Sequence, residues 1–146
     1  MSLQNLLGIS LDAVTPDAAH VARLLAAADR NILDAQLDGL SAENRFDAAY
    51  KAIMQLAMLA LYAKGYRTLT SKPGHHQTAI QTLPLTLGVP ARQVIVLDAL
   101  RKQRNLSDYS GDLVPDSVVV DCLASAKDLL AQVRASLMLD ERGHQG

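Results

Sequence analysis

The stretch Ala52-Ile-Met-Gln-Leu-Ala-Met-Leu-Ala-Leu-Tyr-Ala63 decides the fold of this chain. Its only interruption by a strongly polar side chain is Gln55. A helix that is apolar almost all round is buried on most of its sides, either in the middle of a helical bundle or at a subunit interface. The run is too short to span a bilayer, so we expect no membrane segment and a soluble protein.

The residues on either side of this run mark the ends of its helix. Ser41 is a favourable N-cap, and Glu43 places an acid in the first turn, near the positive end of the helix dipole. Lys64-Gly65 is a favourable C-terminal signal, since glycine accepts the left-handed backbone that often ends a helix. The sequence therefore predicts one long, buried helix between Ser41 and Lys64.

Caps, prolines and apolar stripes predict four further helices. These four helices are expected to span Thr15 to Asp38, His75 to Leu83, Pro90 to Gly111, and Pro115 to Leu137. Short connections between consecutive helices favour antiparallel neighbours, so we predict an all-α, up-down bundle of four to five helices. We expect a single domain over residues 1–146, with residues 1–14 and 141–146 flexible.

Composition supports this fold class and limits the function. Of the 146 residues, 49% are apolar but only 3% are aromatic, which indicates a core of alanine and leucine. The formal charge of -1 gives no global attraction for nucleic acid, so any anion site must be local. The single cysteine, Cys122, excludes an intramolecular disulfide and lies in an apolar stripe, as a buried inert thiol does. With no signal peptide at the N-terminus, we expect a cytoplasmic protein.

The end of the fourth predicted helix, Arg101-Lys-Gln-Arg104-Asn105-Leu-Ser-Asp108-Tyr109, carries an unusual polar cluster. Helical spacing puts Arg101, Arg104 and Asp108 on one face. Two guanidiniums on one face suit a phosphate or carboxylate, whereas a purely structural interpretation is an exposed helix end with an Arg104–Asp108 salt bridge. Tyr109 lies roughly 140° round the helix from Arg104, so the two share a site only if the helix ends there or a second subunit supplies one of them.

The adjacent pair His75-His76 opens the third predicted helix. Neighbouring histidines on a helix point in different directions, and helical metal pairs are usually four residues apart. We therefore predict no metal and no cofactor, and give these histidines at most a supporting role beside the arginine cluster.

Several segments, in this order, resemble the HEPN superfamily of small α-helical domains. They are Ser41-Ala-Glu-Asn-Arg45-Phe-Asp-Ala-Ala-Tyr50-Lys-Ala, Leu61-Tyr-Ala-Lys-Gly65-Tyr-Arg67, Gly74-His75-His76-Gln-Thr, and Arg101-Lys-Gln-Arg104-Asn105 with Asp108-Tyr109. The similarity covers most of the chain. It implies a homodimeric bundle whose active members are metal-independent ribonucleases, with an arginine, a following polar residue and a histidine forming the site. Arg104 and Asn105 match the first two, whereas Tyr109 stands at the histidine position.

The resemblance implies three functions. The first is a binding module without the full ribonuclease motif, in which Arg101, Arg104, Asn105, Asp108 and Tyr109 hold a nucleotide or RNA phosphate. The second is an active ribonuclease with Arg104 and Asn105 in the site, in which Tyr109, or His75 or His76 brought close by the fold, replaces the missing histidine. The third is a structural partner of a minimal nucleotidyltransferase, as in toxin–antitoxin pairs. We expect the cluster-bearing fourth helix, or the apolar second helix, to supply part of a homodimer interface.

Overall fold

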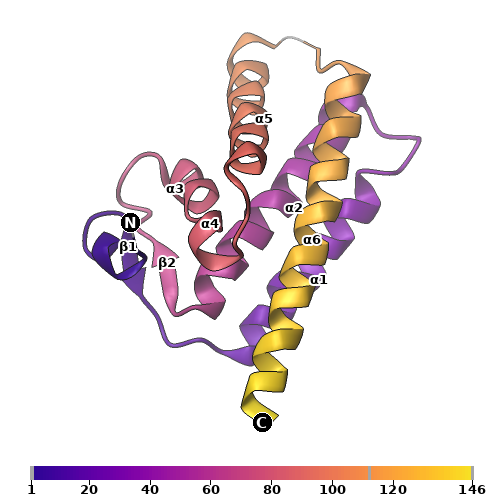
Figure 1. Ribbon diagram of the computed structural model, residues 1–146. Helices are drawn as coiled ribbons and strands as arrows, with labels where there is room; N and C mark the ends of the chain where they lie inside the picture. Colours follow the sequence, from indigo (N-terminus) through magenta and orange to yellow (C-terminus); the bar gives the residue numbers. More distant parts are fainter. Residues whose placement is uncertain (1, 112, 146) are drawn as a thin grey trace.

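The computed structural model describes residues 2–111 and 113–145, without the side chains of residues 109 and 141–145. It is an all-α bundle, as the sequence predicts (Figure 1). Its helices are α1 (Ala18–Asp34), α2 (Ala42–Ala63), α3 (His75–Gln81), α4 (Leu83–Thr86), α5 (Ala91–Ser110) and α6 (Asp116–Gln145).

Helix α2 is the centre of the molecule. It packs along α1 and α6 and also contacts α3, α4 and α5. The side chains of Ile53, Leu56 and Leu61 are completely buried. Ser41 caps the helix by accepting a hydrogen bond from the Asn44 amide at 3.2 Å, which confirms the predicted start. Because its own chain encloses α2, the helix is the middle of a bundle and not a surface left for a second subunit.

Helix α1 begins and ends a little inside its predicted limits. The N-cap is Asp17, whose carboxylate accepts a hydrogen bond from the Ala19 amide at 3.1 Å, and not Thr15. Residues 14–17 are outside regular structure, and Asp17 directly precedes the first helical turn, where its carboxylate can accept from a free amide. The helix ends at Asp34 instead of Asp38.

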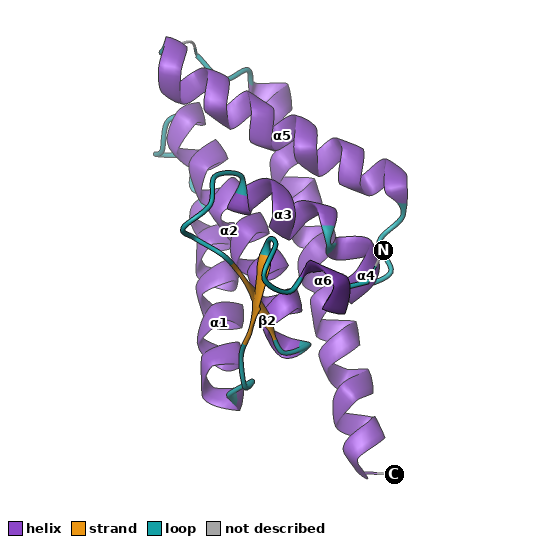
Figure 2. Cartoon of the chain, turned by 90° about the vertical axis from the view of Figure 1, so that its left-hand side faces the viewer, coloured by secondary structure: helices purple, strands orange, loops and turns teal. Residues whose placement is uncertain are grey.

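The N-terminal residues, which we expected to be flexible, are held against the core. A short 3₁₀ helix (Gln4–Leu6) precedes strand β1 (Leu11–Ala13), which pairs antiparallel with β2 (Tyr66–Thr68), as Figure 2 shows. Leu11 is completely buried, and Lys72 Nζ donates to the Ile9 carbonyl at 2.8 Å. Strands of three residues are too short to show alternation in the sequence, so the pairing was not predictable from periodicity.

The segment between α2 and α5 contains an extra helical turn. The third helix was expected to run to Leu83, but α3 already ends at Gln81, and Leu83 begins α4 with Pro84 in its first turn. Proline lacks an amide hydrogen and is tolerated in a first turn, where that hydrogen has no partner. Part of the connection between the third and fourth predicted helices is therefore itself helical.

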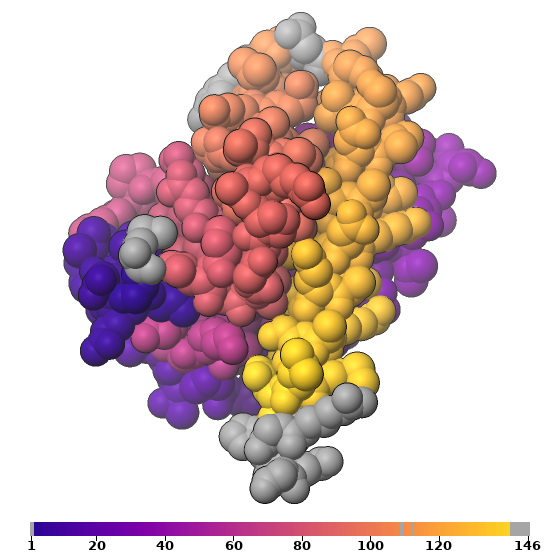
Figure 3. Space-filling model, in the orientation of Figure 1, coloured from indigo at the N-terminus to yellow at the C-terminus, as the bar shows by residue number. Residues whose placement is uncertain are grey.

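Helix α5 ends where the sequence predicts. Gly111 has φ of 71°, a left-handed conformation open to glycine, and its amide donates to the Ser107 carbonyl at 3.2 Å. Figure 3 shows α5 lying between the α3–α4 segment and α6 on one face of the molecule. Ile95 and Leu106 on α5 keep 69% and 63% of their surface exposed, in contrast to the interior of α2. No helix in the described part of the chain is long and apolar enough to cross a membrane.

Candidate functional site

Three helices bring Arg104, Tyr50 and His76 together. The Arg104 guanidinium carbon, on α5, lies 5.0 Å from the centre of the Tyr50 ring, on α2. Tyr50 Oη is hydrogen-bonded to His76 Nδ1, on α3, at 3.2 Å. We call these three residues the Arg104 cluster.

Tyr50 is the buried member of the cluster. Only 2% of its surface is exposed, and its ring stacks near Phe46, one turn earlier, with 6.3 Å between ring centres. A buried phenol needs a partner for its hydroxyl, and His76 supplies it. Burial raises the pKa of Tyr50, and the positive charges of Arg104 and Arg101 oppose that rise. Tyr50 therefore stays protonated at neutral pH.

Arg104 is held in place without being fully paired. Its Nε is buried and has no hydrogen-bond partner among the described residues. The Asp108 carboxylate oxygen lies 3.8 Å away, close enough for an ion pair but too far for a hydrogen bond. The ring face of Tyr50 attracts the cation, and a side-chain hydrogen bond between Arg104 and Tyr50 also opposes the rise in the Tyr50 pKa. The Arg104 Nε–H thus keeps its hydrogen-bonding capacity for an acceptor that the described residues do not provide.

Arg101 differs from Arg104 because it is already paired. Its Nε donates to Asp98 at 2.8 Å, and Lys102 Nζ lies 3.5 Å from the same carboxylate. The hydrogen bond from Arg101 lowers the pKa of Asp98, with the charge of Lys102 adding to it. Arg101 therefore contributes positive charge to the cluster, whereas Arg104 contributes both charge and donors.

Asp47, one turn before Tyr50 on α2, belongs to the same surroundings. Burial raises the pKa of its carboxyl, and the negative charges of Asp108 and Glu43 add to the rise, while Arg104 opposes it. Arg104 therefore lies near two carboxylates, those of Asp47 and Asp108, which repel each other. An anion that replaced Asp108 on Arg104 would bind by exchange and not into an empty positive site.

The two histidines have different positions. Their rings meet edge to face, with 4.7 Å between centres, and His76 makes the hydrogen bond to Tyr50. Burial lowers the pKa of His76, and the charges of His75, Arg104 and Arg101 lower it further. His76 is therefore neutral at pH 7 and able to accept a proton.

The predicted site residues divide into two groups. Arg101, Arg104 and Asp108 share a face, as helical spacing predicts, and the fold adds His76 with His75 beside it. Asn105 is exposed on another side of α5, where an open depression of about 540 Å³ is lined by Lys102, Asn105, Leu106 and Ser110. The side chain of Tyr109 lies outside the described residues, so its position relative to Arg104 stays a prediction.

Tyr50 and Asp47 are the site residues that sequence reasoning missed. Tyr50 lies in the helix that was predicted to be buried, and its side chain is buried, but no partner was predicted for its hydroxyl. A signal was present, because a phenol on a buried face requires a hydrogen bond from somewhere in the fold. Asp47 had no such signal, since only the packing of α5 against α2 brings Arg104 to it.

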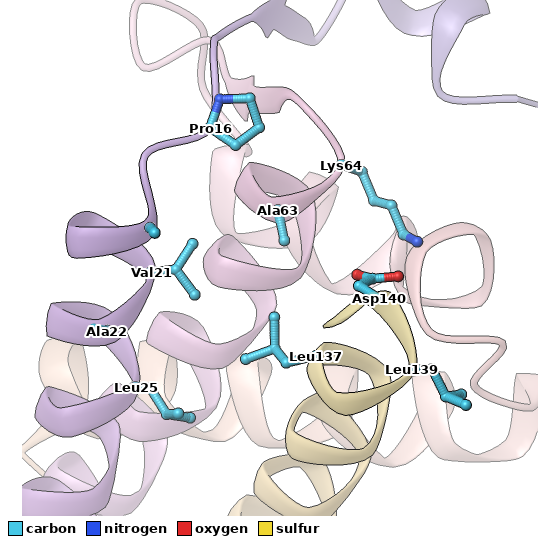
Figure 4. Close-up of a pocket in the computed structure, with 10 residues that line it drawn as sticks. Pro16, Val21, Ala22, Leu25, Ala63, Lys64, Leu137, Leu139 and Asp140 are labelled. Carbon is cyan, nitrogen blue, oxygen red and sulfur yellow. The ribbon is translucent and has the colours of Figure 1, made fainter. Parts of the chain in front are cut away.

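A large groove lies far from this cluster. It encloses about 870 Å³ between the start of α1, the end of α2 and the end of α6, and Figure 4 shows its apolar lining, including Val21, Leu25 and Leu137. Asp47 and the groove residue Ala63 are at opposite ends of α2, roughly 24 Å apart along the helix. The groove and the Arg104 cluster are therefore separate features.

Other reactive groups are inert or absent among the described residues. Cys122 is completely buried, and burial raises its pKa to about 12, so its thiol is no nucleophile at neutral pH. Within the described part of the chain, no three His, Cys, Asp or Glu side chains are arranged to hold a metal ion.

Comparison with known proteins gives no relative from which to transfer a function. No protein-family model matches the chain, and no curated protein matches its sequence. The functional interpretation therefore depends on the geometry of the Arg104 cluster.

Proposed function

We propose that this chain is a HEPN-like phosphate-binding module whose ligand is the phosphate of a nucleotide or of RNA. The observation that carries the proposal is Arg104, whose guanidinium is held over the Tyr50 ring while its buried Nε lacks a hydrogen-bond partner among the described residues. A guanidinium offers a rigid fork of donors that matches two phosphate oxygens. Its orientation is set before the ligand arrives, which reduces the entropy lost on binding.

In this proposal the neighbouring charges have distinct roles. Arg101 remains hydrogen-bonded to Asp98, with 2.8 Å between its Nε and the carboxylate oxygen, and contributes positive charge that attracts the ligand. Asp108 orients Arg104 in the free protein through a loose ion pair, and the ligand replaces it. Asn105 and Lys102 lie on the adjacent side of α5, where a longer ligand would reach them.

Calorimetric titration with uridine 5′-monophosphate and with hexauridylate tests the proposal. The variant Arg104→Ala is expected to bind at least about tenfold more weakly than wild type, the loss of a charged hydrogen-bonded pair. Arg92→Ala, which removes the same charge from an exposed position on the same helix, is the matched control and should change affinity by less than about twofold. Equal binding by wild type and Arg104→Ala, or none by either, contradicts the proposal.

The comparison of the two ligands identifies which source of phosphate the site prefers. Tighter binding of the hexamer, with a steeper dependence on salt, indicates RNA, because more counterions are released from a longer strand. Equal affinity for the monomer and the hexamer indicates a nucleotide site.

A metal-independent ribonuclease is the second candidate, and the position of His76 favours it. This neutral imidazole is linked through Tyr50 to Arg104, so a general base and a phosphate-binding cation share one site. RNA cleavage in the presence of a chelator should disappear in both Arg104→Ala and His76→Gln, and persist in Arg92→Ala. No cleavage by a clean wild-type preparation, or full cleavage by His76→Gln, excludes this candidate.

A further inference from the structure

The Arg104 cluster contains an ionisable group, His76, close to the arginine that is proposed to bind an anion. His76 Nδ1 shares a hydrogen bond with Tyr50 Oη at 3.2 Å, and the Tyr50 ring is itself in contact with the Arg104 guanidinium. His76 is therefore linked through a single residue, Tyr50, to Arg104, which is proposed to bind the phosphate. In the free protein its neutral form is favoured, because burial lowers its pKa and the charges of His75, Arg104 and Arg101 lower it further.

The other ionisable groups around His76 can be named from each packed element. Helix α2 brings Tyr50 and, beside Arg104, Asp47. Helix α5 brings Arg104 and Arg101, and α3 itself brings His75. Helix α4 has no ionisable side chain, and on strand β2, which also carries Tyr66, Arg67 is held by Asp12 at 3.0 Å. Burial, then the neighbouring His75, and then Arg104 and Arg101 all lower the pKa of His76, and of these charged groups Arg104 is the one that would contact the anion.

We infer that phosphate binding at Arg104 is coupled to proton uptake by His76, so that the site binds its anion more tightly as the pH falls. The inference rests on the proposed phosphate site. A bound anion cancels the repulsion from Arg104 and Arg101 and attracts the imidazolium. The Tyr50 hydroxyl accommodates both states, because it donates to neutral Nδ1 and accepts from protonated Nδ1.

Proton binding at His76 and anion binding at Arg104 should strengthen each other. The free site holds His76 unprotonated at pH 7, and the bound site favours the proton, so binding takes up part of a proton. By reciprocity, the proton strengthens binding of the anion by the same factor as the anion strengthens binding of the proton. Each unit by which the anion raises the pKa of His76 corresponds to tenfold tighter binding once His76 is protonated.

Hexauridylate is the probe for this experiment, because its internal phosphodiesters and its bases keep one charge state across the range tested. Affinity should rise about three- to tenfold from about pH 8 to about pH 6 in wild type. Calorimetry in buffers of different ionisation enthalpy should report uptake of a fraction of a proton. His76→Gln should lose both the pH dependence and the uptake, while still binding the hexamer at about pH 8.

Two matched variants separate His76 from its neighbours. His75→Gln should keep the pH dependence, since His75 makes no hydrogen bond to Tyr50 among the described residues. Asp47→Asn should also keep it, which excludes protonation of the Asp47 carboxyl as its source. A slope that survives in His76→Gln, or that disappears in either neighbour variant, overturns the inference. Binding with no pH dependence overturns the inference and leaves the proposed function intact, whereas no binding at any pH overturns both.

Discussion

Helices α2 and α5 are of similar length but have opposite surroundings. Between Phe46 and Leu61 most side chains of α2 are buried, and neighbouring helices enclose it. In α5 the described side chains after Leu100 are all partly or fully exposed, and they include both arginines of the candidate site. The difference teaches that α2 forms most of the buried core, whereas α5 presents the charged side chains of the proposed phosphate site. Tyr50 and Asp47 are the residues of α2 that interact with Arg104 on α5.

The largest expected effect comes from a cavity in α2. Leu56→Ala removes a completely buried side chain and should lower the free energy of unfolding by about 2–5 kcal/mol. The same change at the exposed α5 residue, Leu106→Ala, should cost about 0.5 kcal/mol or less. Urea denaturation of both variants measures the comparison. Similar losses in the two helices would show that α5 contributes to the core as much as α2.

A milder change at Arg104 tests the geometry of α5 instead of its charge. Arg104→Lys keeps the positive charge but loses the planar fork and its stacking on Tyr50. Affinity for hexauridylate should fall about tenfold, while the free energy of unfolding changes by about 0.5 kcal/mol or less. Affinity retained within twofold would mean that only charge matters at this position.

The hydroxyl of Tyr50 links the buried helix α2 to His76 of the Arg104 cluster, and its removal should moderately lower the free energy of unfolding. Tyr50→Phe leaves the ring under Arg104 but deletes the hydrogen bond to His76. The expected loss of stability is about 1 kcal/mol, measured by thermal or urea unfolding. In a His76→Gln background the same substitution should cost clearly less, because the partner is already gone. Equal costs in both backgrounds would mean that the hydrogen bond contributes no stability.

Asp108 provides a prediction of increased affinity. Because its carboxylate lies 3.8 Å from Arg104 Nε, it competes with an incoming anion. Asp108→Asn should therefore strengthen binding of hexauridylate by about two- to fivefold, the size of a partly exposed ion pair. Weaker binding in this variant would show that Asp108 positions Arg104 more than it competes.

The smallest effect concerns the pH dependence of stability at Asp47. Its pKa is raised above the ordinary 3.8, so over the window between the two values the folded state binds more protons than the unfolded state. Its contribution to stability is greatest below this window and falls as the pH rises through it. Asp47→Asn should therefore gain stability relative to wild type as the pH rises from about 4 to 7. A constant difference between the two proteins in urea denaturation contradicts this.

The sequence predicts the elements of this fold better than the contacts of its site. The apolar run of α2, the cap at Ser41 and the stop at Gly111 act locally, so they can be read from composition and spacing. The β1–β2 pairing joins residues far apart in the chain through strands too short to show a pattern. The same limit applies to the site, since the position of His76 depends on how α3 packs between α2 and α5.

Helical spacing predicts one face of α5 but not what lies opposite that face. It places Arg101, Arg104 and Asp108 together, and the structure agrees. Helical spacing does not predict the Tyr50 ring, which belongs to another helix and lies against the Arg104 guanidinium. It also does not predict that Arg104 Nε lacks a hydrogen-bond partner among the described residues. The homodimer, the nucleotidyltransferase partner and the place of Tyr109 stay predictions from the resemblance.

The most direct test of the phosphate site observes Arg104 itself. Heteronuclear NMR of the arginine Nε–H groups resolves each arginine, and the Arg104 signal is assigned by its loss in Arg104→Lys. Because this Nε has no acceptor among the described residues, titration with hexauridylate should shift its proton resonance downfield, far more than that of Arg92. An unmoved Arg104 signal, or equal small shifts of all exposed arginines, would contradict a phosphate site at Arg104.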